Sequence, residues 1–153
     1  MKINNKFRIT LISILSLCIL FIAYLVFTPS FPFHVNVQSG PQPTFIMIGK
    51  AQVCYIPFQE ITNIGFWLNV IMTMPIGGFL LLLNTHKIKF RWVLVTGLLT
   101  GLFIESLQFI LDNTLNGFMR FVDINDVISN TLGVIIGFYA LQLFLLIIIK
   151  IFK

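Results

Sequence analysis

Residues 97–112 read GLLTGLFIESLQFILD, and residues 120–137 read RFVDINDVISNTLGVIIG. Both stretches are largely apolar, yet they carry charged side chains, and one ionisable group inside hydrocarbon costs roughly 2.5–3.5 kcal/mol. Glu105 is the clearest case, because the apolar run Gly-Leu-Phe-Ile comes directly before it. Such a residue needs a structural or functional partner, and the nearest polar groups lie one short loop away.

The composition is that of a membrane protein. Of 153 residues, 58% are hydrophobic and 10% are charged, whereas a soluble domain has roughly 45–50% apolar and about 25% charged residues. In lipid, each spanning segment satisfies its own backbone as a helix, so we predict an all-α fold. The net charge of +5 comes from basic residues at the ends of apolar segments. It therefore does not indicate a nucleic-acid partner.

Four segments have the length of about 20 apolar residues that a spanning helix requires. They are residues 9–27, 64–83, 92–111 and about 125–149. We predict a polytopic bundle of four transmembrane helices. The first is interpreted as a retained anchor, because its apolar run exceeds the ~7–15 residues usual in a cleaved signal peptide.

The remaining segments complete the predicted organisation. Residues 1–8 are an N-terminal tail, and residues 63–153 hold the last three spans. Residues 28–62 form a connector rich in proline and aromatic residues, which either lies on the membrane surface or caps the bundle. Cys18 lies in the first span and Cys54 in this connector, where we predict a loop, and both are interpreted as free thiols.

The distribution of basic residues predicts the orientation. Eight of the ten Lys and Arg residues lie at the two termini and between the second and third spans, and only Lys50 and Arg120 lie on the other side. Because cytoplasmic loops are enriched in Lys and Arg, we predict that both termini are cytoplasmic. The connector and all five acidic residues then belong to the outer half of the bundle.

Helical spacing gathers polar and small residues on single faces of the last three spans. Small residues let helices approach closely, so Gly97 with Gly101 and Gly133 with Gly137 are expected to bring the third and fourth spans together. The residues expected to line an outward-facing polar pocket are Asn69, Thr73, Glu105, Gln108, Arg120, Asp123, Asp126 and Asn130. Those expected to serve helix packing or a kink are Pro75, Gly77, Gly97, Gly101, Gly133 and Gly137.

Four short motifs occur in order between Tyr55 and Tyr139. They are Tyr55-Ile-Pro-Phe58, Asn69 followed by Met74-Pro-Ile-Gly77, Glu105-Ser-Leu-Gln108, and Arg120-Phe-Val-Asp-Ile-Asn-Asp-Val-Ile-Ser-Asn-Thr-Leu-Gly133. Together they resemble the VanZ-like membrane proteins, a family named for resistance to the glycopeptide teicoplanin. One departure is Met74, where the family usually has Phe. The resemblance implies a multi-pass protein of a bacterial cell membrane associated with reduced susceptibility to lipid-tailed glycopeptides.

Two classes of function fit these residues. The first is a non-enzymatic envelope protein whose pocket binds a membrane lipid, a lipid-linked envelope component or the glycopeptide itself, with Arg120 meeting a phosphate or carboxylate bidentately. The alternative is an intramembrane enzyme acting on a lipid-linked substrate through Glu105, with Asp123 and Asp126 holding a divalent cation.

Other readings of these residues stay open. Transport would require an oligomer, since four helices without a visible repeat make a poor carrier. Asn69, Thr73 and Asn130 also fit a purely structural role as interhelical hydrogen bonds. We predict no cofactor and no resident metal, and the sequence leaves the oligomeric state open.

Overall fold

The computed structural model describes residues 5–27, 44–84, 87–115 and 120–151. These form four helices, α1 (Asn5–Phe27), α2 (Ile64–Leu83), α3 (Phe90–Thr114) and α4 (Ile124–Ile151), and three short strands, β1 (Phe45–Ile48), β2 (Ala51–Cys54) and β3 (Phe121–Asp123). All four helices are long and apolar enough to cross a membrane. The prediction of a four-helix polytopic protein is confirmed, and the sheet is an addition to it.

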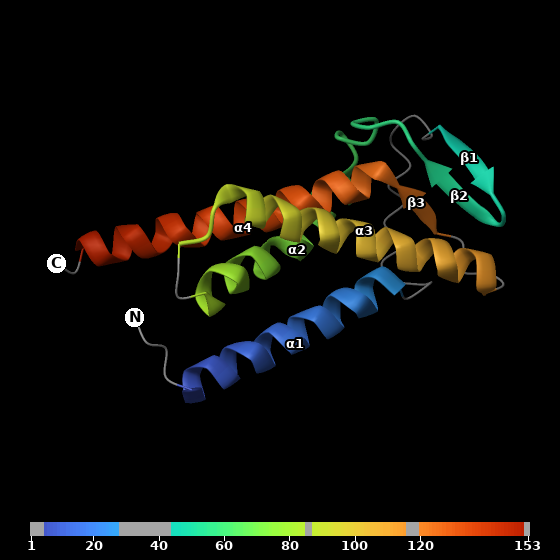
Figure 1. Ribbon diagram of the computed structural model, residues 1–153. Helices are drawn as coiled ribbons and strands as arrows, with labels where there is room; N and C mark the ends of the chain where they lie inside the picture. Colours follow the sequence, from blue (N-terminus) through green and yellow to red (C-terminus); the bar gives the residue numbers. More distant parts are fainter. Residues whose placement is uncertain (1–4, 28–43, 85–86, 116–119, 152–153) are drawn as a thin grey trace.

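The helices run back and forth along one axis, and the sheet lies at one end of them (Figure 1). The start of α1 and the end of α4 lie at the opposite end, which also holds the basic residues that flank α3. Termini on one side and the sheet on the other fit the predicted orientation, in which the sheet end faces outward. That orientation stays a prediction based on charge.

The outer surface of the bundle is apolar, as lipid requires. Leu17 and Leu20 of α1 are 65% and 66% exposed, and Phe103 of α3 is 65% exposed. Water would disfavour such a surface, but hydrocarbon tails are as apolar as these side chains. Peptide groups in the helix interiors bond within their own helix, so they need no hydrogen-bond partner from the lipid.

Close backbone contact holds α2 against α4. A Cβ atom added to any of three glycines in this interface would meet backbone atoms of the neighbouring helix, so only glycine permits this approach. The contacts are Gly77 with Val134, Gly133 with Val70, and Gly137 with Met74. We had expected Gly133 and Gly137 to face the third span, and that expectation is wrong, because a helical stripe defines a face and not which neighbour that face meets.

The contact between α3 and α4 uses the other pair of glycines. A Cβ atom on Gly97 would lie 3.0 Å from the Thr131 backbone, and one on Gly101 would lie 2.9 Å from the Val127 backbone. Val93, Val134 and Phe138 form a buried cluster next to these contacts. The middle of the bundle, from the first turn of α4 to Phe138, is therefore tightly packed.

Proline does not interrupt α2. The helix continues through Pro75, which lies within Ile64–Leu83. The Thr73 hydroxyl bonds the carbonyl of Asn69 at 2.9 Å and lies 3.0 Å from the carbonyl of Asn130 on α4. The Thr73 hydroxyl thus connects α2 to α4.

The sheet joins the connector to the start of α4. β1 and β2 form an antiparallel hairpin, and β2 pairs in parallel with β3, so that Cys54 lies beside Asp123. Gly49 occupies the hairpin turn with φ of 65°, a conformation that glycine adopts without strain. The Lys50 N–H donates to Asn113 Oδ1 at 2.9 Å, which attaches the turn to the end of α3.

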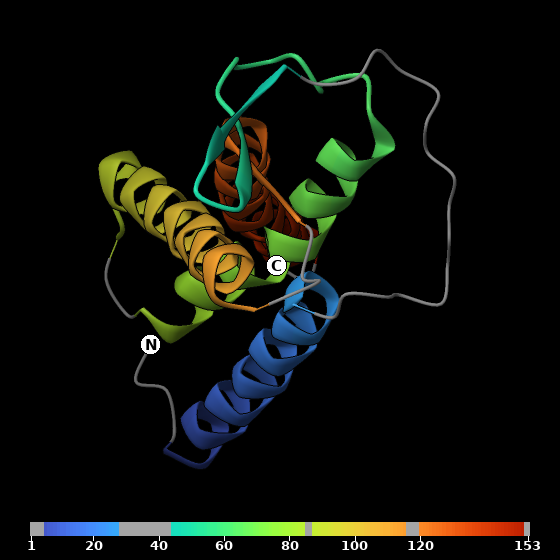
Figure 2. The ribbon, with the colours of Figure 1, turned by 90° about the vertical axis from the view of Figure 1, so that its right-hand side faces the viewer.

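Seen from the sheet end, the hairpin lies across the first turns of α4, with α3 and α2 on its two sides, and the last turns of α1 pack against α2 and α3 (Figure 2). The described part of the connector therefore caps the bundle, while residues 28–43 lie outside the described residues. Cys54 is buried in β2, so the prediction of a loop position is wrong. Both cysteines are free thiols.

Candidate functional site

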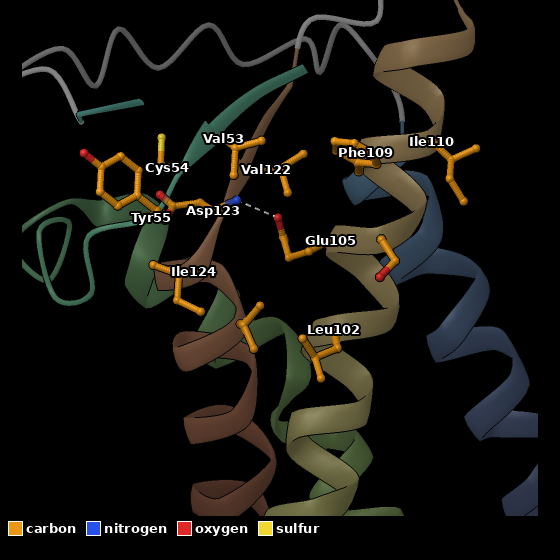
Figure 3. A pocket seen from close by; sticks show the side chains of 12 residues that line it. Val53, Cys54, Tyr55, Leu102, Glu105, Phe109, Ile110, Val122, Asp123 and Ile124 are labelled. Atoms are coloured by element: carbon orange, nitrogen blue, oxygen red, sulfur yellow. Dashed lines mark hydrogen bonds between the residues drawn. The ribbon is translucent and has the colours of Figure 1, made fainter. Parts of the chain in front are cut away.

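Glu105 of α3 is bonded to the segment that leads into α4. Its side chain is 5% exposed, and Oε2 accepts from the Asp123 N–H at 2.8 Å (Figure 3). With its nitrogen turned toward Glu105, the Gln108 amide donates to both carboxylate oxygens, at 3.2 and 3.3 Å. The partner that Glu105 needs is therefore the backbone N–H of Asp123, one loop away in the sequence. The Gln108 side chain, one helical turn along α3, is a second partner.

Asp123 ends β3 and caps α4. Its Oδ1 accepts from the backbone N–H of Asn125 at 2.8 Å, which is the N-cap geometry that Asp favours. The Asn125 side-chain nitrogen donates to the same oxygen at 2.8 Å and to the Ile56 carbonyl at 3.0 Å. Asn125 is fully buried. It therefore connects the cap of α4 to the segment that follows the hairpin.

The other predicted pocket residues lie between α2 and α4. The side chain of Asn69 hydrogen-bonds Asp126. The backbone carbonyl of Asn130 accepts from the Thr73 hydroxyl. Oδ1 of Asn130 has no hydrogen-bond partner among the described residues. The eight predicted residues thus form two neighbouring groups, one at the start of α4 against α3 and one between α4 and α2.

Arg120 is directed toward α1. Its Nη2 donates to the Leu25 carbonyl at 3.3 Å, and its backbone N–H donates to Asp112 Oδ1 at 3.0 Å. Leu25 lies in the last turn of α1, where carbonyls lack partners within the helix and a cation is favoured. The positive charge of Arg120 also acts on Glu105 and Asp126. The guanidinium therefore links α1 to the polar group.

An open cavity of about 500 Å³ lies beside Glu105, between α3, the start of α4 and the sheet. Its lining is Val53, Cys54, Tyr55, Leu102, Glu105, Ser106, Phe109, Ile110, Val122, Asp123, Ile124 and Val127. The walls are mostly apolar, and Glu105 and Asp123 supply the acidic groups (Figure 3). Leu102 and Ile110 are about half exposed on the lipid-facing side of α3, at 50% and 53%. The cavity is therefore an apolar groove with an acidic floor, not the wholly polar pocket we had expected.

Burial shifts the titration of groups at the sheet. It raises the pKa of Asp123, although hydrogen bonds from Asn125 oppose the shift. The pKa of Glu60 is also raised, by burial and by the nearby negative charge of Asp123. Burial, followed by the surrounding carboxylates, raises the pKa of the Cys54 thiol to about 12, so this thiol is protonated at neutral pH and a poor nucleophile.

Within the described ranges, no group of three or more His, Cys, Asp or Glu side chains has the arrangement of a metal site. Asp123 directs Oδ1 to Asn125, and Asp126 bonds Asn69, so each carboxylate serves a different neighbour. What the site offers chemically is hydrogen-bond acceptance at the edge of an apolar surface.

Comparison with known families identifies a relationship for most of the chain. The sequence model of the VanZ/LLP1 family matches residues 15–147, which include α2, α3 and the sheet together with parts of α1 and α4. The chain belongs to the VanZ/LLP1 family. No curated protein and no solved structure gave a match to it. The family match begins within α1, closer to the N-terminus than the motifs that suggested the resemblance.

Three features of this VanZ/LLP1 site were missed at the sequence level. Asn125 was left out, although Asp-Ile-Asn before an apolar run is a helix N-cap signal. Asp112 was also left out, and its Oδ1 accepts from the Arg120 N–H. β2 was not predicted either, because four residues within a long connector are too few to show a strand pattern.

Proposed function

We propose that this VanZ/LLP1 protein is a non-enzymatic, multi-pass protein of a bacterial cell membrane that binds an amphiphile in the groove beside Glu105. By doing so it lowers susceptibility to lipid-tailed glycopeptides such as teicoplanin. The bound molecule is a membrane lipid, a lipid-linked envelope component or the antibiotic. This proposal takes the groove to face the outer leaflet, as the charge distribution predicts.

One observation supports the proposal most directly, namely an apolar groove that is continuous with the lipid-facing surface and ends at buried carboxylates. Its volume of about 500 Å³ lies within the range of small-molecule sites, roughly 300–1,000 Å³, which combine apolar walls with a few placed polar groups. Exposed Leu102 and Ile110 belong both to its wall and to the surface of α3. An apolar chain therefore has access from the membrane without crossing water.

An intramembrane enzyme acting through Glu105, Asp123 and Asp126 is the alternative. It has less support, because Glu105 already accepts from Asp123 and Gln108. Asp126 lies toward Asn69 and is not among the groove residues. The three carboxylates therefore do not converge on one reacting position.

The test is antibiotic susceptibility in a host that expresses wild type, Glu105→Gln or Ser106→Trp at matched membrane levels. Ser106 is exposed and lines the groove, so a tryptophan there fills it. Leu99→Trp is the matched control, because Leu99 is 62% exposed on the same helix and lies outside the lining. We expect protection against teicoplanin, but not against a glycopeptide without a lipid tail, in wild type and in the control.

Both groove variants should lose that protection. Equal susceptibility with and without the wild-type protein would contradict the resistance function. Full protection by Ser106→Trp would show that resistance does not depend on the groove.

A further inference from the structure

The groove has a polarity that restricts its ligand. Glu105 and Asp123 supply its acidic groups and are only 5% and 4% exposed. The lining lies wholly within the described residues and contains no lysine, arginine or histidine. A ligand group that reaches the floor therefore meets acceptors and no side-chain cation.

The surroundings of the floor reinforce this polarity. Asp126 acts electrostatically on Glu105, and Glu60 acts on both Asp126 and Cys54. The charge of Arg120 acts on Glu105 and Asp126, and its guanidinium donates to the Leu25 carbonyl of α1. The described lining of the groove adds no side-chain cation, and interactions between charges are strengthened where water is scarce.

A primary ammonium group has the chemistry that complements such a floor. It brings one positive charge and three N–H donors, and it accepts nothing. A carboxylate offers about four lone-pair positions, of which Glu105 uses part for the Asp123 N–H and the Gln108 amide. The rings of Tyr55 and Phe109 also border the groove, and aromatic faces attract cations.

The apolar walls select the rest of the molecule. They extend along α3 from Leu102 to Ile110, two helical turns that correspond to about 12 Å. Figure 3 shows Leu102 and Phe109 on the side of α3 where Glu105, Val122 and Ile124 lie, whereas Ile110 points away from them at the outer edge of the groove. An alkyl chain placed along these walls stays in contact with the hydrocarbon of the membrane.

We infer that the ligand of this groove is a lipid-tailed amine, whose ammonium group is held by Glu105 while Asp123 adds negative charge nearby, and not a lipid with an anionic group at that position. This inference rests on the proposed amphiphile binding and narrows it. It also replaces our earlier expectation that Arg120 receives a phosphate or carboxylate in the pocket.

The experiment measures equilibrium binding of tritium-labelled dodecylammonium and dodecyl phosphate to the full chain in phosphatidylcholine nanodiscs at neutral pH. Binding to empty nanodiscs is subtracted, and specific binding is the part that Ser106→Trp removes and Leu99→Trp retains. We expect dodecylammonium to bind specifically at least about tenfold more tightly than dodecyl phosphate, as charge-assisted hydrogen bonds predict.

Glu105→Gln should reduce the preference for dodecylammonium over dodecyl phosphate to less than about threefold, and Asp123→Asn should also reduce it. Both variants keep an acceptor oxygen for the N–H that the carboxylate bonds, so the fold is retained. Equal or tighter specific binding of dodecyl phosphate by wild type would overturn the inference while leaving amphiphile binding intact. Failure to detect specific binding of either probe would overturn the inference together with the proposed function.

Discussion

The middle of the helix bundle and its sheet end are built on different principles. In the middle, glycines bring helix backbones together and apolar side chains fill the remaining space. At the sheet end, Glu105, Asp123 and Asn125 are held by directed hydrogen bonds, and an open groove remains beside them. The first arrangement leaves no room for a ligand, whereas the second leaves room and lines it with acceptors.

This difference separates stability from binding. Tight glycine contacts give van der Waals packing, which is the main force between helices when lipid replaces water. Along the groove, one side of α3 lacks such packing. We infer that the tightly packed middle fixes the helix positions on which the hydrogen-bonded end depends, so substitutions in the two regions should have different consequences.

The largest effect on stability is expected in the tightly packed middle of the bundle. In Gly77→Ala, the new Cβ would meet backbone atoms of Val134 and Phe138, and backbone cannot yield as a flexible side chain does. We expect a loss of roughly 2 kcal/mol or more, the size of overpacking a core. Unfolding by sodium dodecyl sulfate, followed by circular dichroism, measures it.

The adjacent glycine supplies the control for that prediction. A Cβ on Gly78 would lie 3.4 Å from the Leu141 side chain, which is ordinary contact. Gly78→Ala should therefore stay within about 0.5 kcal/mol of wild type or gain from helix propensity. An equal loss of stability in the two variants would show that backbone approach between α2 and α4 is not what stabilises this region.

A smaller effect is expected at the hydrogen-bonded end. Asp123→Ala removes the N-cap of α4 and the acceptor of Asn125, and loss of an N-cap costs about 1 kcal/mol. Asp123→Asn should recover most of that loss, because asparagine caps helices nearly as well. The same unfolding measurement applies, and equal destabilisation by Ala and Asn would argue against the cap.

The smallest effect is the pH dependence of stability. Because burial raises the pKa of Asp123, the folded state binds more protons than the unfolded state between the ordinary Asp pKa of about 3.9 and the raised value. Stability from this group is therefore greatest below that window and falls as pH rises through it. Thermal unfolding in detergent from acidic to neutral pH should show this fall in wild type and less of it in Asp123→Asn. Parallel curves for the two proteins would contradict the assigned environment.

Length and hydropathy determine the spans, so the sequence was sufficient to predict four helices. The helical stripe also placed Glu105 on the face that meets the start of α4, because periodicity is a local property. It did not show that Gly133 and Gly137 face α2. Choosing the neighbour of a face requires the packing of the whole bundle, which no local pattern contains.

The sheet and the direction of Arg120 depend on contacts distant in sequence. β2 pairs with β3 across the second and third spans, and its strands are too short to show an alternating pattern. Arg120 reaches Leu25 only because α1 packs beside α2 and α3, and Ile22, Val26 and Ile104 form that contact. The apolar character of the groove follows from this same arrangement and was therefore not predicted.

The central claim is that the groove between α3, the start of α4 and the sheet holds an apolar chain. Photo-crosslinking tests it most directly, with a dodecyl amine that carries a diazirine in its chain, bound to wild type in nanodiscs and mapped by mass spectrometry. The account predicts adducts concentrated at Leu102, Ile110 and Val122, and their loss in Ser106→Trp but not in Leu99→Trp. Adducts spread evenly over lipid-facing positions such as Leu143 and Phe144, unchanged by Ser106→Trp, would contradict it.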